Sequence, residues 1–306
     1  RESIYLLKSC RTPRIAFLFP GQGSQYVGMG RRWYQRYAVV AKHWSECDQA
    51  LTGHLPKSLS DYVWREGYWA HPERSNEWNT ALKDTQVAQP AIVAASMATV
   101  ELLHYLGIES DLSIGHSLGE YTALWASGAI DKATTLGLVS SRGAAMAASG
   151  DAPGAMLSVS ADPEVVETLL ADATGYAVVS NYNAPNQTVV SGERDAIHAL
   201  AARCRSRSIE CTELEVSNAF HSRMMESARQ AMAKILDKAD FGQLRSCMIS
   251  SVHGGFVESD HSLRELLAEQ ITAPVRYVEA IRTATAEGTD VFIEVGPGTV
   301  LSGLTR

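Results

Sequence analysis

A serine between two glycines, Ser117 in the stretch SIGHSLGEY of residues 113–121, is the first candidate for chemistry in this chain. The apolar residues before it are typical of a short strand, and those after it recur at helical spacing. A Gly-X-Ser-X-Gly turn between a strand and a helix is typical of a nucleophile elbow, because small residues permit a strained backbone that exposes the hydroxyl. The N–H of the next residue, Leu118, is then expected to help form an oxyanion hole. The alternative is a helix N-cap serine after a glycine turn.

A serine nucleophile needs a base within hydrogen-bond reach, and histidine, whose unperturbed pKa is about 6.5, is the usual one. Of the nine histidines, His221 in VSNAFHSRMM is the candidate, because it follows the return from an inserted segment. Clefts form at such junctions. His116 adjoins the serine, but neighbours at a tight turn tend to point apart. The others are expected at the surface (His43, His54, His71, His253 and His261) or, within helices, in the core or an interface (His104 and His198).

The elements around Ser117 predict a parallel α/β sheet. Residues 14–20, RIAFLFP, are typical of a buried strand, and the glycine-rich turn PGQGSQ follows them. The Trp-rich stretch that continues to about residue 79 is expected to hold little helix. Residues 89–107 predict a long buried helix, closed by Gly107, that leads into the strand before the serine. Strand, helix, strand and helix in this order indicate a parallel sheet.

The middle of the chain has a different order of elements. It predicts a strand at AMLSVS, a helix at PEVVETLLAD, strands at YAVVSN and QTVVSG, a helix at DAIHALAARC and an alternating strand at SIECTELEV. The order β-α-β-β-α-β is ferredoxin-like. We therefore expect a compact inserted subdomain at residues 154–217 and a large subdomain made of residues 1–153 and 218–306. A last strand and glycine turn, VFIEVGPG, lie near the end of the sequence.

Composition places the chain among ordinary globular proteins and argues against several partners. It has 306 residues, of which 45% are hydrophobic and 20% charged, and its formal net charge is -7. This charge argues against a nucleic-acid-binding surface, and no basic block indicates binding to an anionic membrane. The longest nearly apolar stretch, AIVAASMATVELL, is expected to be too short to span a bilayer. The opening residues lack the apolar core and the cleavage site of a signal peptide.

Five cysteines are scattered along the chain without a C-x-x-C pair: Cys10, Cys47, Cys204, Cys211 and Cys247. This pattern favours a reduced, cytoplasmic protein over a disulfide framework or a zinc site. The sequence begins without methionine, which favours a domain cut from a longer protein. A free-standing enzyme with trimmed ends is the alternative.

Seven motifs together carry a resemblance to a known family. They are FLFPGQGSQYVGMG, TQVAQPAIVAAS, GHSLGEYTAL, SSRGAAM, NYNAPNQTVVSG, NAFHS and EVGPGTVLSGL. With these motifs in this order and spacing, the chain resembles the malonyl-CoA:acyl carrier protein transacylases and the acyltransferase domains of polyketide and fatty acid synthases. The resemblance covers essentially the whole chain. It implies an α/β fold in which an α/β-hydrolase-like large subdomain with a parallel sheet carries an inserted ferredoxin-like small subdomain.

The resemblance implies catalytic roles for matching positions. Ser117 matches the family's nucleophile, and His221 matches its general base and later general acid. The histidine of this family is oriented by a backbone carbonyl instead of an aspartate, and the matching position is Gln270. The oxyanion hole would use the backbone N–H groups of Leu118 and Gln22, where flanking glycines let the backbone approach the substrate.

The resemblance also implies a site for an acyl group that carries a free carboxylate. Arg142 lies in a second apolar helix after the elbow, where an unpaired charge is costly. The family's arginine at this position binds the carboxylate of malonyl or methylmalonyl thioesters as a bidentate fork. On its own, a helical arginine is usually solvated or salt-bridged. Further polar residues match positions that line the family's site, although hydrogen bonds within the fold would explain them nearly as well: Gln89, Asn181 and Asn183.

The implied reaction is a two-step transfer. Ser117 attacks the thioester of malonyl-CoA, coenzyme A leaves, and the phosphopantetheine thiol of an acyl carrier protein takes the malonyl group from the serine. No metal and no bound redox cofactor are expected, since phosphopantetheine arrives on the partner. The expected setting is cytoplasmic polyketide or fatty acid biosynthesis, including antibiotic biosynthesis. Ketosynthase and other synthase domains are expected as covalently linked partners, and neither nucleic acid nor membrane is.

The stretch NAFH, residues 218–221, bears on which acyl group is carried. Family members that select malonyl commonly have His-Ala-Phe-His here, and those that select methylmalonyl commonly have Tyr-Ala-Ser-His. Phe220 is expected to fill the space of an α-methyl group, and Leu118 after the nucleophile also agrees with malonyl. Asn218 departs from both patterns, which leaves methylmalonyl or an unusual extender as alternatives.

Two other classes of function compete with acyl transfer. A serine esterase or acyl-thioesterase on the same elbow should have an acidic triad residue and no arginine clamp. A non-catalytic module that docks a carrier protein would not need the serine and the histidine. For the carrier protein, the spacing of Arg203, Arg205 and Arg207 predicts one positive side of an extended segment, and a solvated edge strand is the alternative.

Overall fold

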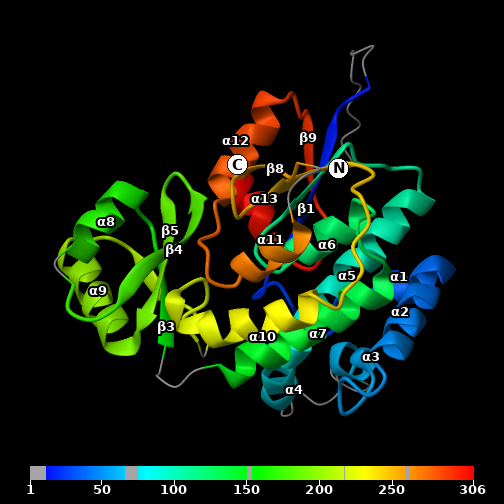
Figure 1. Ribbon diagram of the computed structural model, residues 1–306, viewed down its shortest axis with the longest axis horizontal. Coiled ribbons are helices and arrows are strands. Elements are labelled where there is room, and N and C mark those ends of the chain that lie inside the picture. Colours follow the sequence, from blue (N-terminus) through cyan, green and yellow to red (C-terminus); the bar gives the residue numbers. More distant parts are fainter. Residues whose placement is uncertain (1–11, 66–74, 150–153, 172, 217, 259–261) are drawn as a thin grey trace, which may run out of the picture.

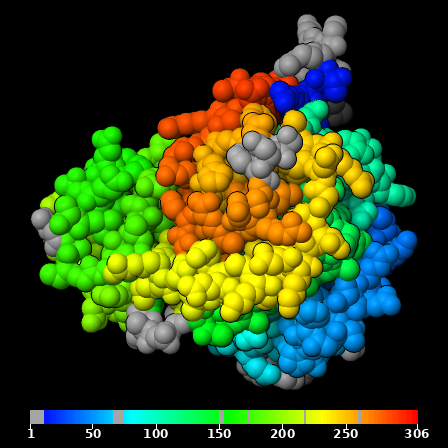
Figure 2. Space-filling view, in the orientation of Figure 1, coloured from blue at the N-terminus to red at the C-terminus, as the bar shows by residue number. Residues whose placement is uncertain are grey.

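The computed structural model of the protein has two β-sheets, with helices packed around the larger one (Figure 1). It describes residues 12–65, 75–149, 154–171, 173–216, 218–258 and 262–306. The expectations for Cys10, His71 and His261 fall outside these residues. The smaller sheet and its two helices form the green lobe on the left of Figure 2, against orange and yellow segments from the last third of the chain. Residues far apart in the sequence therefore meet between the two lobes.

The larger sheet has the strand order β8-β7-β2-β1-β9. Its strands are β1 (Ile15–Phe19), β2 (Leu112–Gly115), β7 (Cys247–Ser250), β8 (Gly255–Phe256) and β9 (Val291–Glu294). All pairs are parallel except that of the edge strand β8 with β7. Strand β1 sends Phe17 and Phe19 into one hydrophobic cluster and Ala16 and Leu18 into another. Because successive side chains point to opposite faces, both faces of the sheet are buried, as is usual for parallel strands.

Helices cover both faces of the larger sheet (Figure 1). Those before the nucleophile turn are α1 (Arg31–Arg36), α2 (Ala38–Ala50), α3 (Leu59–Val63), α4 (Ser75–Lys83) and α5 (Thr85–Tyr105). Those after it are α6 (Gly119–Ala126), α7 (Lys132–Ala148), α10 (Glu226–Leu236), α11 (Leu263–Glu269), α12 (Tyr277–Ala286) and α13 (Val300–Thr305), with a 3-10 turn at Arg223–Met225. Parallel strands with helical connections confirm the predicted α/β class.

The Trp-rich stretch before residue 79 is largely helical, so the prediction that it holds little helix is wrong. Within α2, the buried residues Val40, Trp44 and Cys47 follow one another at helical spacing. The mean hydropathy of this stretch is low because polar and charged residues stand between the buried ones. The apolar stripe was therefore hard to recognise without the fold.

One histidine lies elsewhere than expected, because His43 is buried instead of exposed, and its Nε2 lies 3.0 Å from the Ala94 carbonyl oxygen. His104 and His198 are exposed, so they are not core residues, and their place in an interface stays a prediction. The helical pattern placed these residues on helices correctly, but it did not identify the face of the helix on which each lies.

Helix α5 has 21 residues and is long and apolar enough to cross a membrane by length and composition alone. The apolar stretch of residues 91–103, which was expected to be too short to span a bilayer, lies inside this longer helix. In the structure, 78% of its most apolar window is buried inside the protein. The helix belongs to the larger hydrophobic cluster and packs against α2 and α7. A buried core helix accounts for its hydropathy.

The smaller sheet is antiparallel and has the strand order β4-β5-β3-β6. Its elements follow in the order β3 (Gly154–Val159), α8 (Pro163–Ala171), β4 (Ala177–Ala184), β5 (Gln187–Glu193), α9 (Arg194–Ser206) and β6 (Cys211–Glu213). This is the β-α-β-β-α-β order expected from the sequence, although the last strand is shorter. The sheet has a hydrophobic cluster of its own, which includes Leu157, Val190 and Ile197. The subdomain boundaries themselves stay predictions, because residues 150–153 and 217 lie outside the described chain.

The arginines considered for carrier docking lie on a helix. Arg203 and Arg205 are in the last turn of α9 and Arg207 is its C-cap residue, so the expectation of an extended segment was wrong. Residues two apart on a helix point in different directions, because each residue turns the chain by about 100°. Arg203 Nη1 also donates to the Leu169 carbonyl oxygen at 2.9 Å. The three side chains therefore do not form one aligned row.

A short parallel bridge joins the smaller sheet to the rest of the protein. Asn181 of β4 pairs with Val275, which precedes α12. The Tyr182 N–H donates to the Val275 carbonyl oxygen, and the Val275 N–H donates to the Ser180 carbonyl oxygen, each at 2.8 Å. This bridge fixes the edge of the smaller sheet beside residues 270–276.

Candidate active site

Ser117 lies on a sharp turn between β2 and α6. Its φ of 52° is in the left-handed region, which a non-glycine residue rarely adopts. A Cβ on Gly115 would lie 2.2 Å from the Glu120 nitrogen, and one on Gly119 would lie 2.0 Å from the Phe19 carbonyl oxygen. Only glycine fits at these two positions. The chain can therefore make the tight, strained turn that is typical of a nucleophile elbow.

His221 is the histidine that contacts the serine. Its Nε2 lies 2.7 Å from Ser117 Oγ, and its Nδ1 lies 3.0 Å from the carbonyl oxygens of both Gln270 and Ala273. Since carbonyl oxygens only accept hydrogen bonds, Nδ1 carries the proton and Nε2 is left to accept the hydroxyl proton of Ser117. The result is a serine–histidine pair that is oriented by main-chain oxygens.

Burial keeps His221 neutral. The pKa of the His221 imidazole is lowered to about 3. Burial is the largest cause, followed by the charge of Arg142 and then by His116, and the two carbonyl oxygens act in the opposite direction. A histidine with this pKa is unprotonated at neutral pH and is available as a base. An anion that neutralises Arg142 would make it more basic. His116 has a different contact, because its Nε2 lies 2.8 Å from Asn183 Oδ1.

Two turns place main-chain N–H groups beside Ser117. Leu118 is the N-cap residue of α6, so Ser117 is not a helix cap, as the alternative required. The loop that contains Gln22 passes close by, since a Cβ on Gly21 would lie 3.7 Å from Ser117 Cβ. Within the described chain, neither the Leu118 N–H nor the Gln22 N–H donates to an acceptor. Both N–H groups are thus unpaired within the described chain, which the predicted oxyanion hole requires.

Arg142 is a buried cation with neutral partners. Only 2% of it is exposed, and it donates from Nη1 to Gln89 Oε1 at 2.9 Å and from Nη2 to Gln270 Oε1 at 3.0 Å. Its Nε has no partner, and no carboxylate among the described residues pairs with it. Two amide oxygens compensate a buried guanidinium poorly. The position therefore suits an anionic group, to which a guanidinium can donate through two parallel bonds.

Gln270 contacts three parts of the site. Its Oε1 accepts from Arg142, its Nε2 donates to the Ser117 carbonyl oxygen, and its own carbonyl oxygen accepts from His221. The sequence indicated only the carbonyl oxygen. The side-chain contacts depend on how α7 and residues 270–276 meet in space, and no local pattern in the sequence reports that.

A cavity of about 330 Å³ opens at Ser117, between the two sheets. Strands β3, β4 and β5 form one wall, and loops of the larger lobe together with α13 form the other. The predicted site residues that line it are Gln22, Ser117, Asn181, Asn183, Phe220 and His221. The predicted residues that do not line it are Gln89, Leu118, Arg142, Asn218 and Gln270. A carboxylate in this cavity would therefore reach Arg142 only after a local shift of the side chains between them, and the unpartnered Nε–H is one donor it could use.

Asn218 and Phe220 have different surroundings. Asn218 Nδ2 donates to the Met146 carbonyl oxygen at 2.7 Å, at the C-terminal end of α7. Phe220 is only 7% exposed and lines the cavity. Asn218 thus fixes this stretch to α7, whereas Phe220 shapes the space beside the serine.

Several cavity residues were missed in the sequence. They are Met156 and Ser158 on β3 and Gln187 and Val189 on β5, which lie two apart on their strands, as the predicted Asn181 and Asn183 do on β4. Alternate residues of a strand share one face of a sheet, so this alternation is the signal that could have identified them. Val300 and Leu304 of α13 line the cavity as well, and no chemistry of their own marked them in advance.

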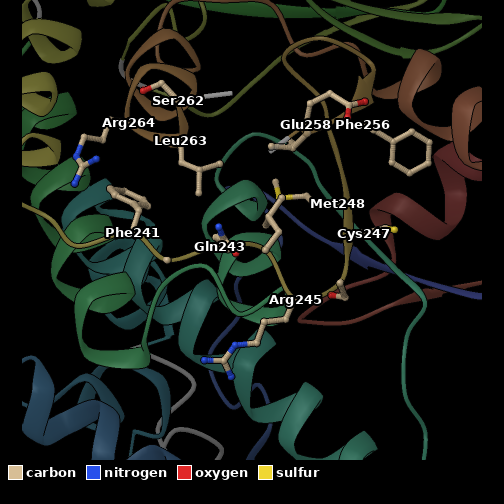
Figure 3. Close-up of a pocket in the computed structure, with 14 residues that line it drawn as sticks. Phe241, Gln243, Arg245, Cys247, Met248, Phe256, Glu258, Ser262, Leu263 and Arg264 are labelled. Carbon is tan, nitrogen blue, oxygen red and sulfur yellow. The ribbon is translucent and has the colours of Figure 1, made fainter. Parts of the chain in front are cut away.

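A larger cavity, of about 640 Å³, lies at the β7–β8 edge of the larger sheet (Figure 3). Phe241, Met248 and Leu263 are among its apolar residues, and Arg264 donates to main-chain carbonyl oxygens at the end of α10. None of the predicted site residues lines it. Across the described residues, no group of three His, Cys, Asp or Glu side chains could hold a metal ion.

Comparisons with known proteins give a family for this chain. Residues 16–305 match the Acyl transferase domain family. The malonyl CoA-acyl carrier protein transacylase of Bacillus subtilis is 33% identical over 299 residues, which cover 96% of this chain and 90% of that protein. Polyketide synthase GfsB of Streptomyces halstedii is 35% identical over 293 residues, which cover 95% of this chain and 5% of the synthase. The chain thus spans nearly all of one relative and a small part of the other.

Solved structures share the fold. The malonyl CoA-acyl carrier protein transacylase of Clostridium perfringens has a TM-score of 0.85 at 32% identity, with 95% of this chain and 89% of that one covered. A malonyl-transacylase in complex with a type II polyketide synthase acyl-carrier protein has a TM-score of 0.85 at 30% identity, with 95% and 92% covered. These likenesses confirm both the fold class and the resemblance that the seven motifs indicated.

Proposed function

The chain belongs to the acyl transferase domain family, and from that premise we propose that it moves a malonyl group from malonyl-CoA to the phosphopantetheine thiol of an acyl carrier protein. It is an acyltransferase of the malonyl-CoA:acyl carrier protein transacylase type. The observation that carries the proposal is the Ser117–His221 contact of 2.7 Å, beside the buried Arg142. This combination suits covalent transfer of an acyl group that bears a negative charge.

The first half of the reaction loads the serine. His221 Nε2 takes the proton of Ser117 Oγ while that oxygen attacks the thioester carbonyl carbon of malonyl-CoA. The carbonyl oxygen becomes an oxyanion, which the N–H groups of Leu118 and Gln22 stabilise. The C–S bond then breaks, and the leaving coenzyme A thiolate takes the proton from the His221 imidazolium. The product is a malonyl-serine ester.

The second half repeats these steps with a different thiol. The phosphopantetheine thiol of the carrier protein gives its proton to His221, and its sulfur attacks the ester carbonyl carbon. Ser117 Oγ leaves as the C–O bond breaks and recovers the proton from His221. Neither half changes an oxidation state, so a nucleophile, a base and oxyanion donors are sufficient for both.

The cavity wall on the smaller sheet suits the phosphopantetheine arm. Asn181, Asn183 and Gln187 offer amide groups there, while Met156 and Val189 offer apolar surface. Phosphopantetheine combines amide groups with short methylene chains, so it can use both kinds of contact. Arrival through this cavity would bring the thiol to Ser117.

We assign Arg142 as the residue that binds the malonyl carboxylate. The carboxylate accepts from the guanidinium, through the unpartnered Nε–H or in place of the amide oxygen of Gln89 or Gln270, and forms the ion pair that the buried guanidinium lacks within the described chain. Because the charge of Arg142 lowers the pKa of His221, this ion pair also makes the base stronger. A charged acyl group would thus be favoured both in binding and in the chemical step.

We assign malonyl, not methylmalonyl, as the preferred group. Phe220 lines the cavity beside His221, where its ring would compete with an α-methyl substituent. Asn218, the residue that departs from the usual patterns, bonds to Met146 and does not line the cavity. Methylmalonyl or another extender is the alternative outcome.

A serine esterase or thioesterase is the alternative mechanism on the same elbow. Such an enzyme should orient its histidine with an acidic side chain. His221 Nδ1 instead lies 3.0 Å from two main-chain carbonyl oxygens. Together with the buried Arg142, these contacts favour transfer over hydrolysis.

We further propose a setting for this activity. The match to 5% of a polyketide synthase supports a domain that works beside a ketosynthase and other linked domains. Polyketide assembly, including the synthesis of antibiotics, is then the pathway class, with fatty acid synthesis as the alternative. A cytoplasmic location is supported by the four described cysteines, which are all free: Cys47, Cys204, Cys211 and Cys247.

The experiment is a transfer assay with malonyl-CoA and a carrier protein that bears phosphopantetheine. We expect malonyl to accumulate on the carrier faster than free malonate is released. The same carrier without phosphopantetheine is the matched control and should stay unloaded. Release of malonate without loading of the carrier would show a hydrolase and would overturn the proposal.

A further inference from the structure

Glu120 is a buried carboxyl group that the proposed reaction does not use. It lies in the first turn of α6, is 0% exposed, and its main-chain N–H donates to the Ser117 carbonyl oxygen at 3.0 Å. Its side chain accepts from Ser250 Oγ at 3.0 Å and from Ser251 through the N–H at 2.5 Å and Oγ at 2.9 Å. One residue thus holds the nucleophile turn with its backbone and a second segment with its side chain.

This second segment leads to the base. Ser250 is the last residue of β7, the strand that pairs with β2 below the nucleophile turn. The Ser251 carbonyl oxygen accepts the Arg276 N–H at 2.6 Å. Residues 270–276 in turn supply the two carbonyl oxygens that orient His221. Glu120 therefore stands between the two segments on which the nucleophile and the base depend.

The contacts of Glu120 are all neutral. Burial raises the pKa of its carboxyl group to about 7, and the hydrogen bonds from Ser251 and Ser250 oppose this shift. A buried carboxyl group without a cation is costly unless hydrogen bonds satisfy it. An apolar side chain would fill this position in α6 at a smaller cost. What the carboxyl group adds is the connection to residues 250–251.

We propose that Glu120 is a positioning residue, which keeps Ser117 and His221 aligned by tying the nucleophile turn to the segment behind the base. The inference rests on the proposed function, because it concerns the rate at which Ser117 is acylated. Without this tie, the pairing of β2 with β7 and the hydrogen bond from Gln270 Nε2 to the Ser117 carbonyl oxygen still link the two segments, but less tightly, and the contact of 2.7 Å between Ser117 Oγ and His221 Nε2 lengthens. A displacement of about 1 Å in a reacting pair costs on the order of 100-fold in rate.

The test compares Glu120→Ala with Glu120→Gln, using Thr122→Val as the matched control. Thr122 lies on the same helix, is 1% exposed, and its hydroxyl has no partner among the described residues. We expect Glu120→Ala to lower kcat for acylation of Ser117 by malonyl-CoA about 100-fold per folded molecule, with KM within about twofold. Glu120→Gln keeps an oxygen for the Ser251 N–H and should recover at least about tenfold of the loss. Thr122→Val should keep the original rate.

An unchanged kcat in Glu120→Ala, with folding verified by circular dichroism, would overturn the inference. Equal losses in Glu120→Ala and Thr122→Val would overturn it as well, because packing in α6 would then explain both. If Glu120→Ala does not fold, Ser251→Ala is the second test, because it removes one hydrogen-bond donor to Glu120. We expect it to lower kcat about tenfold at constant KM. An unchanged kcat in Ser251→Ala would overturn the inference. Failure of the proposed function is distinguishable, since the unsubstituted protein would then form no malonyl adduct on Ser117 or would release malonate without loading the carrier protein.

Discussion

Replacement of Arg142 by alanine tests how the site recognises its acyl group. The substitution removes a guanidinium that is 2% exposed and donates to the side chains of Gln89 and Gln270. Ser117 and His221 act on the thioester carbonyl, which malonyl and acetyl groups share. We therefore expect Arg142→Ala to invert the preference between malonyl-CoA and acetyl-CoA without abolishing the chemical step.

The size of the effect follows from the ion pair that is lost. Two unit charges about 4 Å apart attract each other by about 4 kcal/mol at an effective dielectric constant of about 20. Removal of one partner from a buried ion pair costs about 3–5 kcal/mol. At about 1.4 kcal/mol per tenfold, kcat/KM for malonyl-CoA should fall by roughly two to four orders of magnitude.

Acetyl-CoA should respond in the opposite direction. The charge of Arg142 is the largest cause after burial of the lowered pKa of His221. Without that charge His221 becomes more basic, and a neutral acyl group loses no ion pair. The acylation rate with acetyl-CoA should therefore stay the same or rise.

The assay is the rate of Ser117 acylation by each thioester, followed by intact mass after rapid quenching, with thermal melts to verify folding. Arg142→Lys is the matched control, because it keeps the charge but not the planar fork. Its malonyl rate should lie between those of the unsubstituted protein and Arg142→Ala. Parallel losses with malonyl-CoA and acetyl-CoA would refute the reasoning and remove Arg142 from carboxylate recognition.

Three further substitutions test the pocket, the core and the nucleophile turn. Phe220→Ser should shift the kcat/KM ratio from malonyl toward methylmalonyl by roughly 10- to 200-fold, since one methyl group is worth about 1–3 kcal/mol; an unchanged ratio would exclude Phe220 as the gate. Burial lowers the pKa of His43 to about 4, so the folded protein binds fewer protons at this site than the unfolded chain does. The stability that the neutral His43 contributes above pH about 6.5 is therefore lost as the pH falls toward 4. Between pH about 6.5 and about 5, the free energy of unfolding in urea should fall by about 2 kcal/mol less for His43→Leu than for the unsubstituted protein. The same pH dependence of this free energy in both proteins would contradict the expectation. Gly119→Ala puts a Cβ 2.0 Å from a main-chain oxygen and should lower the free energy of unfolding by about 3 kcal/mol. Gly137→Ala is the control, because a Cβ there meets nothing within 4 Å, and it should not lower the free energy of unfolding in this way. Equal melting temperatures of the two variants would argue against the tight turn.

The fold could be predicted wherever hydrophobic periodicity was strong over a whole element. The strand Ile15–Phe19 is entirely apolar, and the smaller sheet alternates strands and helices in an order with few alternatives. The stripe of α2 was not recognised, because Trp44 and its buried neighbours stand among polar residues. The segment at residues 203–207 was placed in an extended conformation because three alternating arginines are too few to distinguish a strand from the end of a helix.

The candidate site could be predicted where a local motif carries it. The glycines around Ser117 indicate a tight turn by themselves, the return from the inserted segment indicated His221 as a candidate, and the family resemblance assigned the roles of His221 and Arg142. The side chains of Gln270 and Glu120 were not predicted to bridge parts of the site. Their partners are distant in the sequence and come together only when β7, α6 and α7 pack, so no spacing along the chain reports the contacts.

The central claim is that Ser117 carries the malonyl group and that His221 activates it. The most direct measurement is intact mass after mixing with malonyl-CoA, with peptide mapping to locate the adduct. The account predicts one malonyl group on Ser117 in the unsubstituted protein, none in Ser117→Ala, and formation slower by on the order of 10⁴- to 10⁶-fold in His221→Ala. A stoichiometric malonyl adduct that persists in Ser117→Ala would contradict it.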